Sequence, residues 1–193
     1  MSFMLLGILN SQASGGGGGG SYDLLETYNV TTTGVDAIDF TGLDSYSDYQ
    51  HLQLRYVAGL ETTGTSPITL LFRLNSDSSS SYAWHHLMGN DNLVTSSSGS
   101  ATNYIQLQKA LDTDSDTSDQ FGAGIVDFLD FSSTNKSTTL RALYGVNHLP
   151  DPAVALASGL WNNTAAVTTI NLIRTGLNFA VGSRFSIYGI KGA

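Results

Sequence analysis

An acidic run near the middle of the chain has the residue types of a calcium loop. Asp112, Asp114 and Asp116 alternate with threonine and serine, and hard oxygen ligands at alternate positions can converge on one cation. The match is incomplete, because Thr117 stands where an EF-hand places glycine and Ala123 stands where it places a bidentate glutamate. We therefore predict a solvated acidic loop without a bound metal, and keep calcium as the alternative.

A pair of carboxylates, Asp127 and Asp130, lies in the apolar run 125–131. Glycoside hydrolysis needs two carboxylates at a set separation across a sugar cleft. Residues three apart in a strand project to opposite sides, so this pair does not meet that requirement. We predict structural roles, in which one aspartate caps a turn or pairs with an arginine such as Arg141.

His85 and His86 are the only adjacent histidines and could suggest a metal site. Neighbouring side chains on a strand point to opposite faces, so the two rings cannot hold one ion. We expect one ring to pack beside Trp84 and the other to face solvent or a neighbouring subunit. The chain also contains no cysteine, no Gly-x-Ser-x-Gly motif and only two glutamates. We predict no catalytic residues, no cofactor and no enzymatic activity.

Composition restricts the partners of this 193-residue chain, whose formal net charge is -8. The eight lysines and arginines are spread singly and form no basic patch, which argues against nucleic-acid binding. Charged residues make up only 12% of the sequence, while serine, threonine, glycine, asparagine and tyrosine are abundant. This surface chemistry is typical of extracellular or virion β proteins.

The elements that must position these residues are strands. Apolar and polar residues alternate in segments such as 52–56, 68–74, 82–88, 139–146 and 184–190, and about ten or eleven strands are expected. The connections between them are polar and turn-forming, for example 75–81, 95–102 and 112–119. We predict an all-β fold, an antiparallel two-sheet sandwich of jelly-roll type, and exclude a parallel α/β enzyme.

The first twenty residues differ from the rest. Residues 1–9 are apolar and uncharged, and six consecutive glycines occupy 15–20, so we predict an N-terminal arm on a flexible tether and a β domain over 21–193. No lysine or arginine precedes Arg55, which disfavours a secretory signal, and the apolar run is shorter than the about 20 residues that cross a membrane. The expected assembly anchor consists of Phe3, Met4, Leu5, Leu6, Ile8 and Leu9.

Four segments carry a resemblance to a known group of proteins: 1–13 before the glycine tract, 22–27, 42–55 and 182–191. Over nearly its whole length the chain resembles small virion structural proteins of tailed bacteriophages, especially marine phages. The resemblance implies a place on the exterior of the capsid or the tail, as a capsid decoration protein or a tail-fibre component. It brings no catalytic residues with it.

The leading functional hypothesis is therefore a non-enzymatic virion protein that binds other virion proteins through its arm. Unprotected strand edges and outward side chains such as Leu71, Leu87 and Leu143 predict a homo-oligomer, with a trimer favoured. The alternative is a carbohydrate-binding, lectin-like module that recognises a host glycan. That alternative requires exposed aromatic side chains, for which Tyr46, Tyr49 and Trp161 are the candidates.

Overall fold

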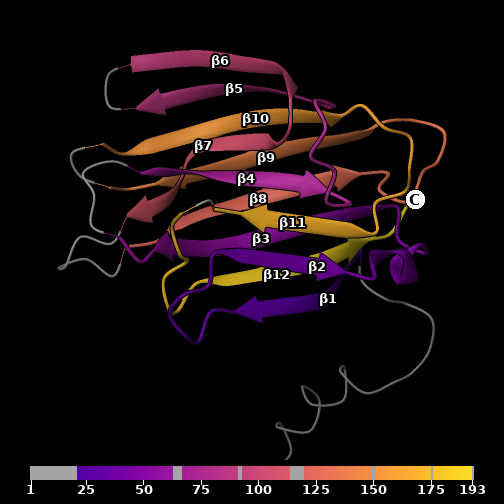
Figure 1. Cartoon of the computed structure of the whole chain (residues 1–193), viewed down its shortest axis with the longest axis horizontal. Helices are drawn as coiled ribbons and strands as arrows, with labels where there is room; N and C mark the ends of the chain where they lie inside the picture. Colours follow the sequence, from indigo (N-terminus) through magenta and orange to yellow (C-terminus); the bar gives the residue numbers. More distant parts are fainter. Residues whose placement is uncertain are drawn as a thin grey trace, which may run out of the picture.

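The computed structural model describes residues 21–62, 67–90, 93–113, 120–148, 151–174 and 176–192. Within these ranges the chain forms twelve strands and one short 3-10 helix, η1 (Figure 1). Their bounds are β1 Tyr22–Asn29, β2 Ala37–Thr41, η1 Leu43–Tyr46, β3 His51–Leu60, β4 Ile68–Leu74, β5 Tyr82–Asn90, β6 Leu93–Thr102, β7 Ile105–Thr113, β8 Gly122–Leu129, β9 Thr138–Val146, β10 Ala153–Trp161, β11 Thr169–Ile173 and β12 Arg184–Ile190.

The strands form two branches of one hydrogen-bonded network. The eight-stranded branch has the order β1-β12-β3-β8-β9-β10-β5-β6, and the four-stranded branch has the order β2-β11-β4-β7. Every pairing inside a branch is antiparallel. A short parallel pairing of β3 with β7 joins the branches, at Gly59–Asp112 and Leu60–Thr113. The prediction of an all-β, mostly antiparallel fold is confirmed. Because hydrogen bonds join all twelve strands, the pairing does not define two separate sheets.

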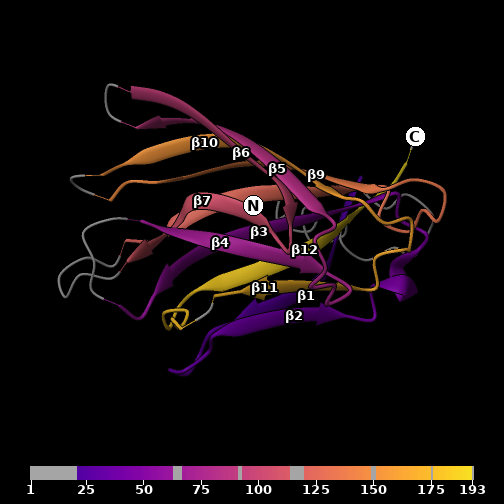
Figure 2. The same cartoon turned by 45° about the horizontal axis from the view of Figure 1, so that its top comes forward.

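The four-stranded branch folds back across the middle of the eight-stranded branch (Figures 1 and 2). Strand β7 contacts β8, β9 and β10. Phe72 of β4 meets Phe128 of β8 edge to face, with 6.0 Å between ring centroids. Strands β5 and β6 extend beyond this overlap, and β6 forms the outermost edge in both views. The buried core of the described residues lies between the branches.

Strand β10 shows how close this packing is. Its residues alternate strictly between buried and exposed, and the buried positions from Ala153 to Gly159 carry only small side chains. A Cβ atom added to Gly159 would lie 2.7 Å from the Ile105 side chain of β7, so the crossing strand leaves no room for a larger residue. Consequently the larger side chains Leu156 and Leu160 point outward.

Strand β6 is the main departure from the expected secondary structure, because residues 95–102 were expected to form a connection. Its run of serines has no alternation of apolar and polar residues, and nearly all of its positions are exposed. It is nevertheless a strand because its backbone pairs with β5 along the whole length of both strands. Gly99 allows Trp84 to pack directly beneath it, where a Cβ atom would lie 2.6 Å from the indole.

Candidate functional site

The outer face of the eight-stranded branch, turned away from the four-stranded branch, carries a row of large apolar side chains. We call Ile125, Leu143, Leu156 and Leu87 the apolar row. Each residue lies directly opposite the next across β8, β9, β10 and β5. Their exposed fractions are 40%, 53%, 56% and 51%, respectively. The row is therefore a continuous apolar line across four strands, and about half of its side-chain surface faces solvent.

Three valines extend this surface along the strands. Val57, Val154 and Val94 are 50%, 59% and 75% exposed and belong to the neighbouring row of outward positions. Contiguous apolar patches of this kind on a protein surface mark interaction sites more often than isolated apolar residues do. Leu87 and Leu143 point outward, as predicted, whereas Leu71 on the other branch is only partly exposed.

Two shallow hollows lie on either side of Leu156. One has a volume of about 500 Å³ and is lined by His85, Leu87, Ser96, Ser98 and Ser158 together with Leu156. The other, of about 270 Å³, lies between the apolar row and the ion pair described below. The face is thus uneven enough to accept protruding side chains of a partner.

A polar row runs beside the apolar row. Gln53 Nε2 donates to Asp127 Oδ1 at 2.7 Å, and Arg141 Nε donates to Asp127 Oδ2 at 2.8 Å. Arg55 Nε donates to Gln53 Oε1 at 2.7 Å. This chain of hydrogen bonds leaves no lone carboxylate on the face, which makes Asp127 a structural residue, paired with Arg141 as predicted.

At the β1 end of the same face, an arginine lies between two tyrosine rings. The Arg55 guanidinium carbon is 5.4 Å from the ring centroid of Tyr22 and 4.6 Å from that of Tyr188. Tyr22 is 49% exposed. Arginine and tyrosine are enriched at the energetic centres of protein interfaces, because they combine apolar area with directed polar contacts.

The outer face differs in charge from the rest of the molecule. Its strands present Arg55, Arg141 and Arg184 outward, three of the eight lysines and arginines in the chain. Among the acidic residues in the described part of the chain, Asp127 alone lies at an outward position of these strands. A chain of net charge -8 therefore has one face that is apolar and weakly basic.

Asp130, the second predicted carboxylate, lies in the turn after β8 with a positive φ of 51°. It forms an ion pair with Lys136 and accepts a hydrogen bond from Gln50 at 3.2 Å. The Lys136 hydrogen bond, followed by that of Gln50, holds the pKa of Asp130 below its ordinary value. Asp127 and Asp130 thus have separate partners.

The two neighbouring histidines lie on opposite faces of β5, as predicted. The His86 ring stacks on Trp84 with 5.5 Å between centroids and an interplanar angle of 4°. Burial lowers the pKa of His86, which favours the neutral imidazole. His85 is exposed on the outer face, where it lines the larger hollow.

Asp112 differs from the expectation of a solvated loop. It belongs to β7, is fully buried, and its Oδ1 lies 2.6 Å from Nδ1 of His148, which is 4% exposed. Asp114 and Asp116 lie outside the described residues. Within the described ranges, no group of three or more His, Cys, Asp and Glu side chains is placed to hold a metal ion.

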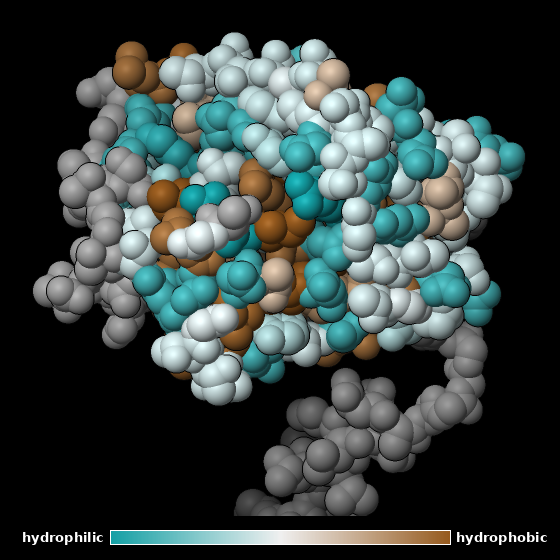
Figure 3. All heavy atoms as spheres, viewed as in Figure 1, coloured by the Kyte–Doolittle hydropathy of each residue, from teal (hydrophilic) through white to brown (hydrophobic). Residues whose placement is uncertain are grey.

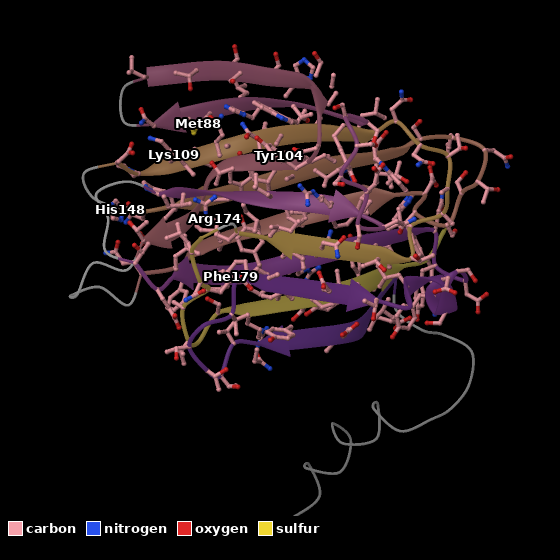
Figure 4. The ribbon with its side chains drawn as sticks, viewed as in Figure 1. Met88, Tyr104, Lys109, His148, Arg174 and Phe179 are labelled. Carbon is pink, nitrogen blue, oxygen red and sulfur yellow. The ribbon has the colours of Figure 1, made fainter. Side chains whose placement is uncertain are left out.

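Sequence reasoning missed the role of His148, because its partner is 36 positions away and no motif connects them. In Figure 4 His148 lies at the same end of the molecule as Lys109 and Met88. Lys109 forms an ion pair with Asp151, which also accepts a hydrogen bond from Asn90 at 2.9 Å. These contacts tie the β9–β10 connection to β5 and β7, which is a structural function.

The aromatic residues expected for glycan stacking are not freely exposed. Trp161 is 1% exposed and stacks on Tyr82, so its predicted exposure is wrong. Its position continues the inward phase of β10, which explains the burial. Tyr46 and Tyr49 are partly buried against the core. The six residues of the expected anchor, Phe3 to Leu9, lie outside the described residues.

Comparisons with protein-family models, with curated proteins and with solved structures find no match to this chain. None of the helical structure in the described part of the chain is long and apolar enough to cross a membrane.

Proposed function

We propose that this protein is a non-enzymatic structural component on the exterior of a bacteriophage virion, either a capsid decoration protein or a tail-fibre component. The apolar row is the main observation that supports this proposal. It lies on a face whose other side chains are well packed and hydrogen-bonded. Half-exposed leucines in adjacent register on four strands offer binding area to a macromolecular partner. An assembly component needs such an area.

Two features of the sequence support the same proposal. The apolar residues 1–9 precede a six-glycine tether, an arrangement suited to anchoring in a neighbouring protein. The resemblance to virion structural proteins of tailed phages covers both ends of the chain and the segment 42–55. We propose that the arm binds another virion protein and that the β domain forms a homo-oligomer, with three copies favoured.

We also propose that the two branches act as the two layers of a jelly-roll-like sandwich. Supporting contacts come from β7, which crosses β8, β9 and β10, and from the close approach of Ile105 to Gly159. A sandwich confines the core between two layers and leaves the outer face of each layer available for binding.

Deletion of residues 1–20 tests the anchoring role. We expect the truncated protein to keep its cooperative unfolding transition but to be absent from purified particles, because the glycine tether transmits little structure from the arm to β1. Circular dichroism checks folding, and mass spectrometry of purified particles checks incorporation. Incorporation of the truncated protein at the level of the full chain would contradict the anchoring role.

The proposed absence of catalysis has its own test. Asp127→Asn and Asp130→Asn should change stability or assembly only, because each carboxylate is held by structural partners. A glycan-cleaving activity of the unmodified protein that either substitution abolishes would refute the structural interpretation.

A polar hollow favours one second candidate function, glycan binding. This hollow, of about 430 Å³, is lined by Tyr49, Gln50, Asp130, Ser133 and Lys136 among others. However, one side of the Tyr49 ring packs on Gly189, and Lys191 lies 5.8 Å from the ring centroid. The ring is therefore poorly placed for stacking on a sugar. A glycan array with the purified protein tests this function, and Lys136→Ala should abolish any binding that the hollow provides.

A further inference from the structure

We propose that the outer face of the eight-stranded branch is a subunit interface, and that its occupant is the acidic β2–η1 surface of a second copy of this chain. The contact is head-to-tail, as in a closed ring. This inference deepens the proposed homo-oligomer by naming the surfaces that meet. It does not depend on whether the particle partner belongs to a capsid or a tail.

The size of the face suits a stable contact. Eight strands about 4.8 Å apart span about 35 Å, and four outward rows about 7 Å apart span about 20 Å along the strands. The resulting area approaches the about 800 Å² per partner of standard protein interfaces. Its centre is apolar and its margins contain arginines and tyrosines, which is the distribution found in such interfaces.

Charge complementarity identifies the occupant. Three outward arginines and one paired aspartate make the face weakly basic, although the whole chain carries a net charge of -8. A face-to-face contact between identical surfaces would bring arginines toward arginines. A contact with an acidic surface of the neighbouring copy instead pairs opposite charges. Heterologous contacts of this kind form a ring when the rotation between copies closes, as proposed for three copies.

The β2–η1 segment provides such an acidic surface. Asp36, Asp39 and Asp44 are all exposed on or next to β2, which is a free edge of the four-stranded branch. Neither β2 nor η1 contains a lysine or arginine. Of the arginines in the adjacent segments, Arg174, directly after β11, donates its amide to the Asp36 carbonyl. Arg73 of β4 donates its Nε to the Asn103 carbonyl. Asp39 accepts a hydrogen bond from Asn171 at 2.8 Å, which orients its carboxylate on the outer surface of this branch.

Sedimentation velocity of the full chain between 1 and 50 µM tests the interface. We expect the unmodified protein to sediment as an oligomer and the Leu143→Asp/Leu156→Asp variant as a monomer, with association at least about 100-fold weaker because two carboxylates would be buried. Leu93→Asp is the matched control, because Leu93 is 65% exposed but is not part of the apolar row. If the double aspartate variant unfolds, Leu143→Ser/Leu156→Ser replaces it without added charge.

Charge reversal tests the orientation. Arg141→Glu/Arg184→Glu and Asp36→Lys/Asp44→Lys should each weaken association at least about tenfold, and all four changes in one chain should restore it. The effect of either pair should shrink as salt is raised, because the groups involved are exposed. Absence of rescue in the fourfold variant would refute the β2–η1 surface as the occupant.

The remaining outcomes distinguish other occupants. If the unmodified protein is a monomer at 50 µM, the proposed interface is wrong. The proposed virion role still stands in that case if incorporation into particles depends on the arm. Loss of the oligomer on deletion of residues 1–20 would identify the arm as the occupant of the face and also refute the inference. Conversely, the oligomer can depend on Leu143 and Leu156 while the protein is absent from purified particles. That result would support the interface and refute the virion role.

Discussion

The outer faces of the two branches differ in how far their side chains are covered by contacts within the chain. On the four-stranded branch, polar side chains pair with each other: Asn171 donates to Asp39, and Arg73 donates its Nε to the Asn103 carbonyl at 2.9 Å. Its outward Leu71 is partly buried. Figure 3 views the molecule from this side, where hydrophilic residues cover most of the surface around a small apolar area. The eight-stranded branch instead leaves a row of four large apolar side chains half exposed.

The four-stranded branch therefore covers its large outward apolar side chains within the chain, whereas the eight-stranded branch leaves its own half exposed. What the four-stranded branch leaves exposed is mainly polar, above all the acidic β2–η1 surface proposed as the binding partner. Both faces belong to strands that bury their inner sides in the same core. The stability of the single chain should therefore depend on inner positions of both branches. Its association should depend on the outer face of the eight-stranded branch and on the acidic β2–η1 surface.

Alanine substitutions at two leucines of β9 should differ most in their effect on the stability of the monomer. Leu140 is fully buried and Leu143 is 53% exposed. Leu140→Ala should destabilise the monomer by about 2–5 kcal/mol, since it leaves a cavity in the core. Leu143→Ala should change monomer stability by at most about 0.5 kcal/mol. Urea unfolding under conditions where the protein is monomeric measures both. Equal losses would show that the outer row is part of the folding core.

The contact between the branches gives the next effect. Gly159→Ala should destabilise by about 1–3 kcal/mol, because the new Cβ would lie 2.7 Å from the Ile105 side chain. Gly89→Ala is the matched control on the neighbouring strand, where the added Cβ would meet only Val154, at 3.8 Å. Thermal unfolding of both variants decides the matter. An unchanged melting temperature for Gly159→Ala would mean that the branches are less tightly packed than described.

The turn between β4 and β5 gives an effect that depends on pH. Asp77 accepts hydrogen bonds from the Ser79 amide at 2.8 Å and from the Trp161 indole at 2.7 Å. The side-chain hydrogen bond from Ser79, followed by that from the Trp161 indole, holds the pKa of Asp77 well below its ordinary value of 3.8, and the Ser79 amide adds a smaller effect in the same direction. Because the folded pKa is lowered, the ionised carboxylate stabilises the fold above the unfolded pKa, and this contribution is lost as pH falls toward the folded pKa.

Asp77→Ala should therefore cost about 1–3 kcal/mol at pH 7, where it leaves the buried indole without an acceptor and removes a charged hydrogen bond. The difference from the unmodified protein should narrow below about pH 4. Urea midpoints across pH 3 to 7 measure the trend, with Asp48→Ala as an exposed control outside the proposed interface. A difference that grows in acid would contradict the assigned direction of the pKa shift.

The smallest effect concerns the polar row. Arg141 is 69% exposed in its side chain, so the ion pair with Asp127 should contribute only about 0–1 kcal/mol to the stability of the monomer. Arg141→Gln should leave the unfolding midpoint nearly unchanged, and Lys136→Gln, which removes the exposed ion pair with Asp130, provides the comparison. If Arg141→Gln lowers the free energy of unfolding by well above this range, the polar row contributes substantially to the stability of the single chain.

Much of the fold could be predicted from local patterns. Alternating residues in 82–88 and 139–146 identified two strands at nearly the observed positions, and those in 52–56 identified the first half of β3. The opposite orientations of His85 and His86 follow from strand geometry alone. The pairing of Asp127 with Arg141 was also expected, because a half-buried carboxylate needs a partner. These features depend on residues close in sequence or on general chemistry.

Other features depended on segments distant in the sequence. The pairing of Asp112 with His148 joins residues 36 positions apart, and no local signal indicates it. Strand β6 consists mainly of residues that resemble a loop, and it is ordered by the backbone of β5. The sequence also does not order the strands into two branches, since β3 pairs with β8 and β12 rather than with its neighbours along the chain.

The strand-rich class and the two-residue period of strands such as β10 follow from the residue pattern, because side chains on an extended backbone must alternate. Which phase of that period faces the core depends on packing between the branches. On β10 the inward phase is Ala155, Ala157, Gly159 and Trp161, although Leu156 and Leu160 are the larger aliphatic residues of the segment. The reason is steric, since Ile105 of the crossing strand β7 occupies the space above Gly159 and leaves the leucines to the outer face.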